Sequence, residues 1–244
     1  MTQLPLAGEV AVVAGATSDI GRAVCVGLAA AGARVRLLGR DAGTLDEVAK
    51  AVRTFTEDVA AYPMDLTADD SIAEVATRLC REAGRVDLLV HSAGRFAMAP
   101  HDRAAVADFD RQHHTNVRGP YLLTQHLLPL LRAYRGQIVF VNSTVALHAR
   151  AGVGQYASTQ HALRAIADAL RAEVNADGVR VLSIYLGRTA TARQARIFRL
   201  EGRPYAPELL IQPDDVAEMI LASVRLPRTA EVTEIRMRPL VKSY

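Results

Sequence analysis

The sequence predicts an α/β fold, a doubly wound parallel sheet with helices on both faces, formed by a single domain over residues 1–244. Short apolar runs alternate along the chain with Ala-, Leu- and Arg-rich segments that have helical periodicity. The runs are apolar on both faces, which is typical of parallel strands covered by helices on each side. Half of the 244 residues are hydrophobic, enough for a substantial core, and no linker or repeat divides the chain.

Each expected strand is an apolar run that ends near a glycine or a polar residue. The runs lie at residues 9–15, 34–39, 86–94, 136–143 and 179–187, a further strand ends in the YPMDLT segment, and residues 231–240 are expected to form a last strand with a tail. Right-handed crossovers through the intervening helices connect such strands. The segment from about 188 to 212 is the least regular and carries five arginines, so we expect a mobile, lid-like insertion there.

Composition and charge exclude several classes of function. The 29 basic and 26 acidic residues leave a formal charge of +3, with no long basic run and few aromatic residues, so nucleic acid is not an expected partner. The histidines lack a metal-ligand pattern, and no metal site is expected. Cys25 and Cys80 are too few for a disulfide framework and fit buried thiols in helices. Without a leader or a bilayer-length apolar stretch, we expect a soluble cytoplasmic protein with no membrane partner.

The first strand end carries a glycine-containing turn, VVAGATSDIGRAV. Ligands of open parallel sheets bind beyond the carboxyl ends of the strands. Gly15 can take a tight turn, Gly21 lets a helix that opens at Ile20 and Gly21 pack closely, and the amides at the helix start face an anion. A dinucleotide pyrophosphate would satisfy these amides. The alternative is a plain tight turn with no ligand.

The next two strand ends favour a phosphorylated cofactor. Arg40 follows the second strand, where dinucleotide folds usually present an acidic residue to the adenosine ribose, and an arginine there favours the 2′-phosphate of NADP over NAD. Ser18 can add a hydroxyl donor to the same phosphate. The alternative for Arg40 is a solvated surface side chain. Asp65 can accept from the adenine amino group while Leu66 packs on the ring, or Asp65 can simply cap the next helix.

From about residue 5 to the C-terminus, the sequence resembles the short-chain dehydrogenase/reductase family. AGATSDIG at residues 14–21 stands where that family has TGxxxGIG, and HSAG at residues 91–94 stands for NNAG. NVRG begins at Asn116, VNSTVA carries Ser143 and YASTQ carries Tyr156, with the family's spacing between the serine and the tyrosine. Several weak motifs in the right order make a strong joint signal.

This resemblance implies an NADP(H)-dependent oxidoreductase with a Rossmann fold that reduces a carbonyl of a small molecule. Tyr156 would protonate the developing alkoxide, Ser143 would bind the same oxygen, and Asn116 would hold a water. With Gln160, these are the expected catalytic residues. The expected cofactor contacts are Gly15, Thr17, Ser18, Asp19, Ile20, Gly21, Arg40, Asp65, Leu66, Ser92, Ala93, Gly94, Tyr156, Gln160, Gly187, Thr189 and Thr191.

Gln160 stands where the family has a lysine, four residues after Tyr156 and therefore on the same helix face. Its amide can bind a ribose hydroxyl but supplies no charge. Tyr156 should then titrate nearer its ordinary pKa of about 10, and proton transfer should slow roughly tenfold to a hundredfold. We expect a slow reductase with poor reverse activity. Two alternatives are a catalytically weak nucleotide-binding subunit and a non-redox isomerase, dehydratase or cyclase.

Other positions depart from the family pattern in ways that bear on the site. Asp19 replaces a glycine and is expected to point outward from the helix start, and Leu186 replaces the proline before Gly187. His161 lies on a different helix face from Gln160, whereas an arginine from residues 188–203 can reach into the site. The resemblance also implies a homodimer or homotetramer that forms through the helix containing HLLPLLRAY and the helix after Tyr156.

Overall fold

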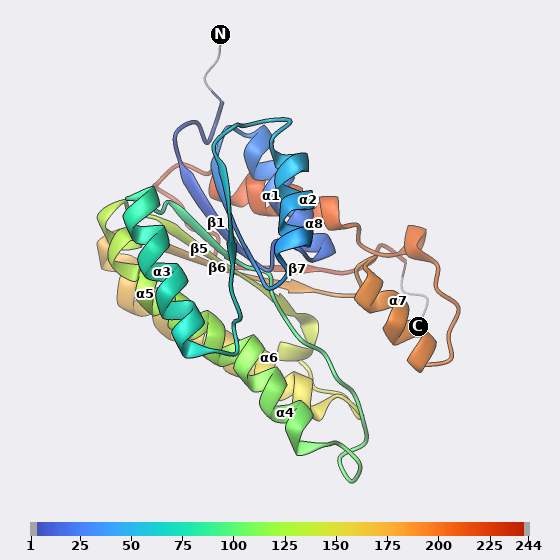
Figure 1. Cartoon of the computed structure of the whole chain (residues 1–244). Helices are drawn as coiled ribbons and strands as arrows, with labels where there is room; N and C mark the ends of the chain where they lie inside the picture. The colour runs from blue at the N-terminus through green and yellow to red at the C-terminus, as the bar shows by residue number, and fades with distance from the viewer. Residues whose placement is uncertain (1–3, 242–244) are drawn as a thin grey trace.

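The computed structural model describes residues 4–241, so the predicted domain of residues 1–244 extends beyond it at both ends. Its strands form one sheet between helices (Figure 1). All strands of this sheet are parallel, and their order is β3-β2-β1-β4-β5-β6-β7. The order reverses between β1 and β4, which confirms the predicted doubly wound fold. The strands are β1 (Val10–Ala14), β2 (Arg34–Gly39), β3 (Val59–Pro63), β4 (Leu88–His91), β5 (Gln137–Ser143), β6 (Arg180–Leu186) and β7 (Glu234–Met237).

The central strands are apolar throughout because both of their faces are buried. Every residue of β1 and of β4 is buried, and alternate side chains of β1 enter different clusters of the core. Ala11 and Val13 belong to one cluster, which also contains residues of the first, second and last helices. Val12 and Ala14 belong to the other cluster. The first layer contains α1 (Asp19–Ala30), α2 (Ala42–Val52) and α8 (Pro213–Val224), and the second contains α3 (Asp69–Ala83), α5 (Gly119–Ala133) and α6 (Gly154–Val174).

The long helix expected after the fourth strand is interrupted. It consists of α4 (Val106–His113), a π-helical stretch (His114–Arg118) and α5. The π-helical stretch inserts extra residues into the turn and changes the direction in which its side chains point. Asn116 lies in this stretch and is buried. π-helical segments of this length are often found at functional sites.

The segment of residues 188–212 is more regular than predicted. It contains α7 (Ala192–Leu200), orange in Figure 1, which lies beyond the sheet and apart from the two helical layers. Thr191 caps α7 by accepting a hydrogen bond from the Gln194 amide, and Ile197 and Phe198 are buried. The expectation of an irregular segment was therefore wrong for these residues, because two apolar contacts and a cap are enough to hold a short helix.

Two smaller predictions, on the cysteines and on the last strand, are tested directly by the structure. Cys25 is buried in α1, but Cys80 of α3 is only partly buried. Of the helices within residues 4–241, none combines the length and the apolar character needed to cross a membrane. No group of metal-ligating side chains was found among these residues either. The predicted last strand is present as β7, parallel to β6.

Candidate active site

Two adjoining cavities lie at the carboxyl ends of the strands, where the predicted ligand site is expected. The larger has a volume of about 720 Å³ and lies over the ends of β5 and β6. The smaller has a volume of about 570 Å³ and lies over the ends of β2 and β3. Both cavities are lined by Ser18, Ala93, Gly94 and Arg193, so they meet above β1 and β4. Together they form one cleft across the strand-order reversal.

The glycine turn after β1 holds three elements in close contact. Gly15 has a φ of +84°, and a Cβ atom there would lie 2.4 Å from the amide nitrogen of Ala93. A Cβ atom on Gly21 would lie 2.1 Å from the carbonyl oxygen of Gly15. Any larger residue at either position would collide with backbone. Both glycines therefore have the structural roles that the sequence predicts.

Helix α1 begins at Asp19, one residue earlier than predicted, with Ser18 as its N-cap. The side chains of both residues form hydrogen bonds within the protein. The Ser18 hydroxyl accepts from the Gly21 amide at 3.0 Å and donates to the Gly15 carbonyl at 2.8 Å. The hydroxyl therefore caps the helix, and its hydrogen atom is donated within the turn and not to a ligand. The Asp19 carboxylate accepts at 3.0 Å from the amide of Ala192, in the first turn of α7. Asp19 thus points outward as expected, but it caps a neighbouring helix.

At the smaller cavity, Arg40 is exposed and Leu66 is buried. Among the described residues, Arg40 has neither an ion pair nor a side-chain hydrogen bond, so its guanidinium is available to a ligand. Asp65 accepts from the Thr67 amide at 2.9 Å and from its hydroxyl at 2.8 Å. The hydrogen bond from the Thr67 amide lowers the pKa of Asp65. Its carboxylate therefore holds the turn after β3, while α3 has no side-chain cap.

The end of β4 brings Ser92, Ala93 and Gly94 to the junction of the cavities. Ser92 donates to the Ala14 carbonyl at 3.0 Å, which ties this loop to β1. His91, just before it, is buried, and burial lowers the pKa of its imidazole to about 3. His91 is therefore neutral at physiological pH and makes a 2.8 Å hydrogen bond with Thr124.

Tyr156 and Ser143 face the larger cavity from two different elements, α6 and β5. The Phe96 ring meets the tyrosine ring edge-on, with 4.9 Å between centroids. Burial raises the pKa of Tyr156. The charge of Arg193 and a hydrogen bond from Ser143 act in the opposite direction but are smaller, so the pKa stays above its ordinary value. The phenol is neutral at pH 7 and remains so well into the alkaline range. The predicted pair of hydroxyls is brought together.

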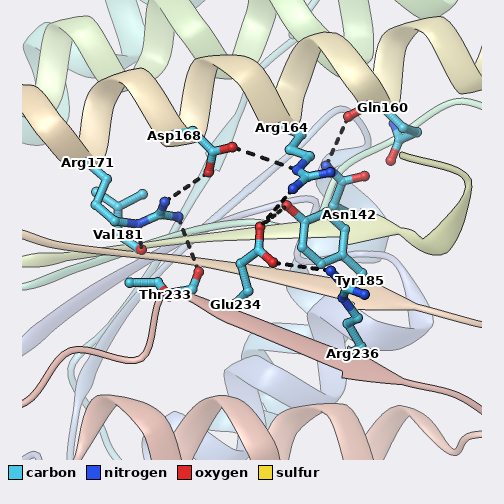
Figure 2. A network of polar contacts seen from close by, with 10 residues as sticks. All are labelled: Asn142, Gln160, Arg164, Asp168, Arg171, Val181, Tyr185, Thr233, Glu234 and Arg236. Carbon is cyan, nitrogen blue, oxygen red and sulfur yellow. Dashed lines mark hydrogen bonds and ion pairs between the residues drawn. The ribbon is translucent and has the colours of Figure 1, made fainter. Parts of the chain in front are cut away.

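Asn142 fixes Ser143 relative to α6. Its side-chain oxygen accepts from the Ser143 amide at 2.6 Å, and its side-chain nitrogen donates at 3.1 Å to the backbone carbonyl of Gln160. Figure 2 shows this bond beside a second set of contacts from the same helix. Sequence reasoning missed Asn142, although its place directly before Ser143 at a strand end was a usable signal.

Further polar contacts join α6 to β6 and β7 (Figure 2). Arg164 lies 3.4 Å from the carboxylate of Glu234, which also accepts at 3.2 Å from the Tyr185 hydroxyl. Arg171 donates to the backbone carbonyls of Val181, at 2.8 Å, and of Thr233, at 3.1 Å. These contacts hold the helix that carries Tyr156 against the sheet.

Gln160 lies one turn after Tyr156, lines the larger cavity and is buried. Its amide nitrogen lies 3.4 Å from the hydroxyl of Thr159. Asn116 donates to the same hydroxyl at 3.0 Å and to the Arg95 carbonyl at 2.9 Å, and it accepts from the Arg95 amide at 2.7 Å. The side chains of Gln160 and Asn116 are therefore joined through Thr159, which sequence reasoning did not single out.

The remaining predicted contacts lie on the segment after β6. Gly187, Thr189 and Thr191 all border the larger cavity, and the Thr189 hydroxyl donates to the Gly187 carbonyl at 3.3 Å. Thr17 and Ile20 border the smaller and the larger cavity, respectively. Every predicted site residue except Gly21, which is packed beneath the turn, therefore lines the cleft.

Arg193 is a further residue of the site. One of its guanidinium nitrogens donates a hydrogen bond to the carbonyl oxygen of Gly94 at the junction of the two cavities. The sequence left open which arginine of residues 188–203 can reach the site. His161, in contrast, is exposed and hydrogen-bonds to the backbone of its own helix, as expected.

Comparisons with known proteins agree with this geometry. The family model described as short chain dehydrogenase matches residues 9–201. An uncharacterised short-chain type dehydrogenase/reductase of Sinorhizobium fredii is 31% identical over 236 residues, which are 95% of this chain and 91% of that protein. A short chain dehydrogenase from Shigella flexneri, solved in complex with NADP, has a TM-score of 0.88 and 28% identity and covers 96% of this chain and 99% of its own. A metagenomic short-chain oxidoreductase, also in complex with NADP, has a TM-score of 0.84 and 27% identity, over 98% of this chain and 100% of its own.

Proposed function

The chain belongs to the short-chain dehydrogenase/reductase family of oxidoreductases, and from this premise we propose that it reduces a ketone or aldehyde to an alcohol with NADPH. The observation that carries the proposal is the pair of hydroxyls, Tyr156 and Ser143, that meet in the larger cavity. These are the two groups that carbonyl reduction in this family requires. Gln160 takes the position of the family's lysine.

The cleft fits a phosphorylated dinucleotide. Its two cavities adjoin at the glycine turn, so one extended ligand can occupy both. Arg40 lines the smaller cavity, and its guanidinium forms no ion pair or side-chain hydrogen bond within residues 4–241, which supports a 2′-phosphate and therefore NADP(H) over NAD(H). The NADP complexes of two structures similar to this chain support the same preference. Arg40, Leu66, Gly94 and Thr191 would hold the cofactor along this cleft.

The residues of the larger cavity would supply the proton chemistry. When bound, NADPH supplies the hydride for the carbonyl carbon. The Tyr156 hydroxyl would donate its proton to the carbonyl oxygen, and Ser143 would donate a hydrogen bond to the same oxygen. Burial raises the pKa of Tyr156 and keeps the phenol neutral, which is the form that reduction uses. Alcohol oxidation uses the phenolate instead, so the reverse reaction is expected to be slow at pH 7.

NADPH consumption with a panel of ketones and aldehydes tests the proposal. Tyr156→Phe should abolish turnover while leaving the Kd for NADPH, measured by fluorescence, within about threefold of the wild type. Ser143→Ala should lower kcat by roughly a hundredfold. Alcohol oxidation that equals carbonyl reduction at pH 7 and matched saturation would contradict the proposed direction.

The same assay separates the two alternatives to a reductase. NADPH binding without turnover of any carbonyl compound would indicate a nucleotide-binding subunit. Product formation without NADPH consumption would indicate a non-redox enzyme on this fold. Both outcomes would overturn the proposed reaction.

The quaternary structure is also a proposal. A homodimer or homotetramer would form through α5 and α6, the helices that the family uses for this purpose. Exposed apolar side chains on and next to α5 support this, notably Tyr121 and Tyr134. Light scattering on Tyr121→Glu and on the wild type would test it, since a charge inside the interface should lower the measured mass.

A further inference from the structure

We propose that Arg193 of α7 supplies the positive charge at Tyr156 that Gln160 does not supply. The inference rests on the proposed function for its chemistry, but the position of the guanidinium is a separate observation. It also assigns a role to the segment of residues 188–212, which lines the larger cavity: the segment would carry part of the reaction centre.

The guanidinium of Arg193 reaches into the centre of the cleft. It donates to the Gly94 carbonyl, and its other terminal nitrogen lies 3.5 Å from the point where a Cβ atom on Gly94 would be. The same point is 3.6 Å from the side-chain oxygen of Asn116. Arg193 thus lies at the end of β4, on the same side of Gly94 as Asn116, and at the junction that both cavities share.

The charge of Arg193 is not neutralised by a neighbouring carboxylate. Among the described residues, no acidic side chain forms an ion pair with it. Two other arginines of the larger cavity, Arg150 and Arg188, are instead paired with Glu201, at 3.7 and 2.7 Å. Among the described residues that line the cavity, the charged group that lowers the pKa of Tyr156, against the larger effect of burial, is the guanidinium of Arg193. The other charged or titratable residues that face the cavity are Asp19, His148 and Arg238.

The start of α7, directly before and after Arg193, is held by two hydrogen bonds. Thr191 caps the helix from within, by accepting from the Gln194 amide at 3.1 Å. Asp19 caps it from α1, by accepting from the amide of Ala192, the residue before Arg193. Asp19 stands in place of a glycine of the family motif, and Gln160 in place of its lysine. Helix α7 connects these two replacements. The Asp19 carboxylate bonds to the start of α7, and the same helix carries the guanidinium of Arg193 toward the region of Gln160.

The proposed role is electrostatic. When Tyr156 gives its proton to the carbonyl oxygen, the phenolate that remains is stabilised by a nearby positive charge until it takes up a proton from water. A guanidinium keeps its charge over the whole working range of pH, so its effect does not titrate away. Gln160, with its amide directed at Thr159, can bind a ribose hydroxyl but cannot stabilise the phenolate in this way.

The test compares Arg193→Gln with Arg193→Lys, Gln160→Lys and the double variant Arg193→Gln/Gln160→Lys. Arg196→Gln is the matched control, since Arg196 lies on the same helix and is exposed. The first readout is the absorbance titration of Tyr156, obtained as the difference between each variant and the same variant carrying Tyr156→Phe. The second is kcat for NADPH-dependent carbonyl reduction as a function of pH.

Arg193→Gln should move the Tyr156 titration to higher pH and lower kcat roughly tenfold, whereas Arg193→Lys should retain most of both. Arg196→Gln should resemble the wild type in both readouts. Gln160→Lys should raise kcat roughly tenfold in the Arg193→Gln background and clearly less in the wild type, because the two cations would act on one phenol.

An unchanged Tyr156 titration in Arg193→Gln would overturn the inference, as would an equal gain from Gln160→Lys in both backgrounds. The titration requires no turnover. A protein that reduces no carbonyl compound would therefore contradict the proposed function while the absorbance measurement still decides the role of Arg193. Thermal unfolding of each variant identifies one that has lost its fold, and Arg193→Lys, which keeps the charge, gives a second measure of the same effect.

Discussion

The carboxylate of Asp19 accepts a hydrogen bond of 3.0 Å from the backbone amide of Ala192, 173 residues away in the sequence. The bond joins the start of α1 to the start of α7. A carboxylate at a helix N-terminus also interacts favourably with the helix dipole. This one contact therefore connects the glycine turn of the cleft to a segment that lines the larger cavity.

Removing the Asp19 carboxylate should loosen α7. In Asp19→Ala, amide hydrogen exchange over residues 192–200 should accelerate roughly fivefold, as expected for the loss of about 1 kcal/mol of local stability. Mass spectrometry of peptic fragments measures this exchange. Asp41→Ala is the control, because Asp41 caps α2 by accepting from the Thr44 amide and should affect only that helix. Unchanged exchange in α7 would show that the Asp19 contact is not needed.

Arg40 should determine the preference between the two nicotinamide cofactors. Arg40→Ala should raise the Kd for NADPH roughly tenfold or more and leave the Kd for NADH unchanged, since only NADPH has the 2′-phosphate. Fluorescence titration gives both constants. Arg111→Ala serves for comparison, because Arg111 lines the same cavity but is already paired with Asp108 at 2.6 Å. An equal loss of affinity for both cofactors would count against the 2′-phosphate contact.

A substitution at Gly15 should be far more costly than one at another glycine of similar backbone conformation. Gly15→Ala combines the strain of a φ of +84° with a collision with Ala93, and should lower the free energy of unfolding by about 3 kcal/mol. At Gly152, φ is +76° but no atom of the described residues lies within 4 Å of the added Cβ, so the strain alone should cost about 1 kcal/mol. Urea denaturation compares the two. Equal costs would mean that the β1 turn relaxes around the methyl group.

His91 should make the fold sensitive to acid. Its pKa is about 3 in the folded protein and about 6.5 in the unfolded chain. Below pH 6.5 the unfolded chain binds a proton that the folded protein excludes, so stability is complete above that pH and is lost as the pH falls toward 3. The loss reaches about 1.4 kcal/mol per pH unit.

Urea denaturation of His91→Asn between pH 7 and pH 4 tests this prediction. The variant should show a smaller loss of stability over this range than the wild type, whatever its absolute stability. His161→Asn removes an exposed histidine and should keep the wild-type dependence. Parallel curves for the wild type and His91→Asn would mean that the buried imidazole is protonated in the folded state.

The sheet could be predicted because its signal is local. Val10–Ala14 is buried at every position, so the run is apolar throughout and is recognisable in the sequence. Gly15 and Ser143 lie at or just after strands of this kind, and the place of the cleft follows from the strand order. Tyr156 lies in α6 and is assigned from the family resemblance, through its spacing to Ser143. The site could therefore be assembled from sequence as far as it depends on strand ends.

The contributions of α7 could not be predicted, because they depend on distant contacts. Ala192–Leu200 is rich in arginine and poor in apolar residues, and only Ile197 and Phe198 of this helix are buried, so the sequence contains little indication that it packs against the rest of the protein. Arg193 reaches the cleft from a helix whose first turn is bonded to Asp19, and no local pattern relates these two residues. The role of Ser18 differs, since a serine three residues before Gly21 is a helix-cap signal that the sequence contains.

Because the strand order reverses between β1 and β4, the two ends of the cleft are encoded by separate parts of the gene. Arg40, Asp65 and Leu66, at the proposed adenosine end, precede residue 67, whereas Ser143, Tyr156 and Arg193 follow the crossover into β4. A single recombination event in the stretch that encodes α3 would exchange one end and preserve the other. Cofactor preference and carbonyl chemistry can thus be inherited from different parents, and laboratory chimaeras joined at α3 offer a direct route to altering one without redesigning the other.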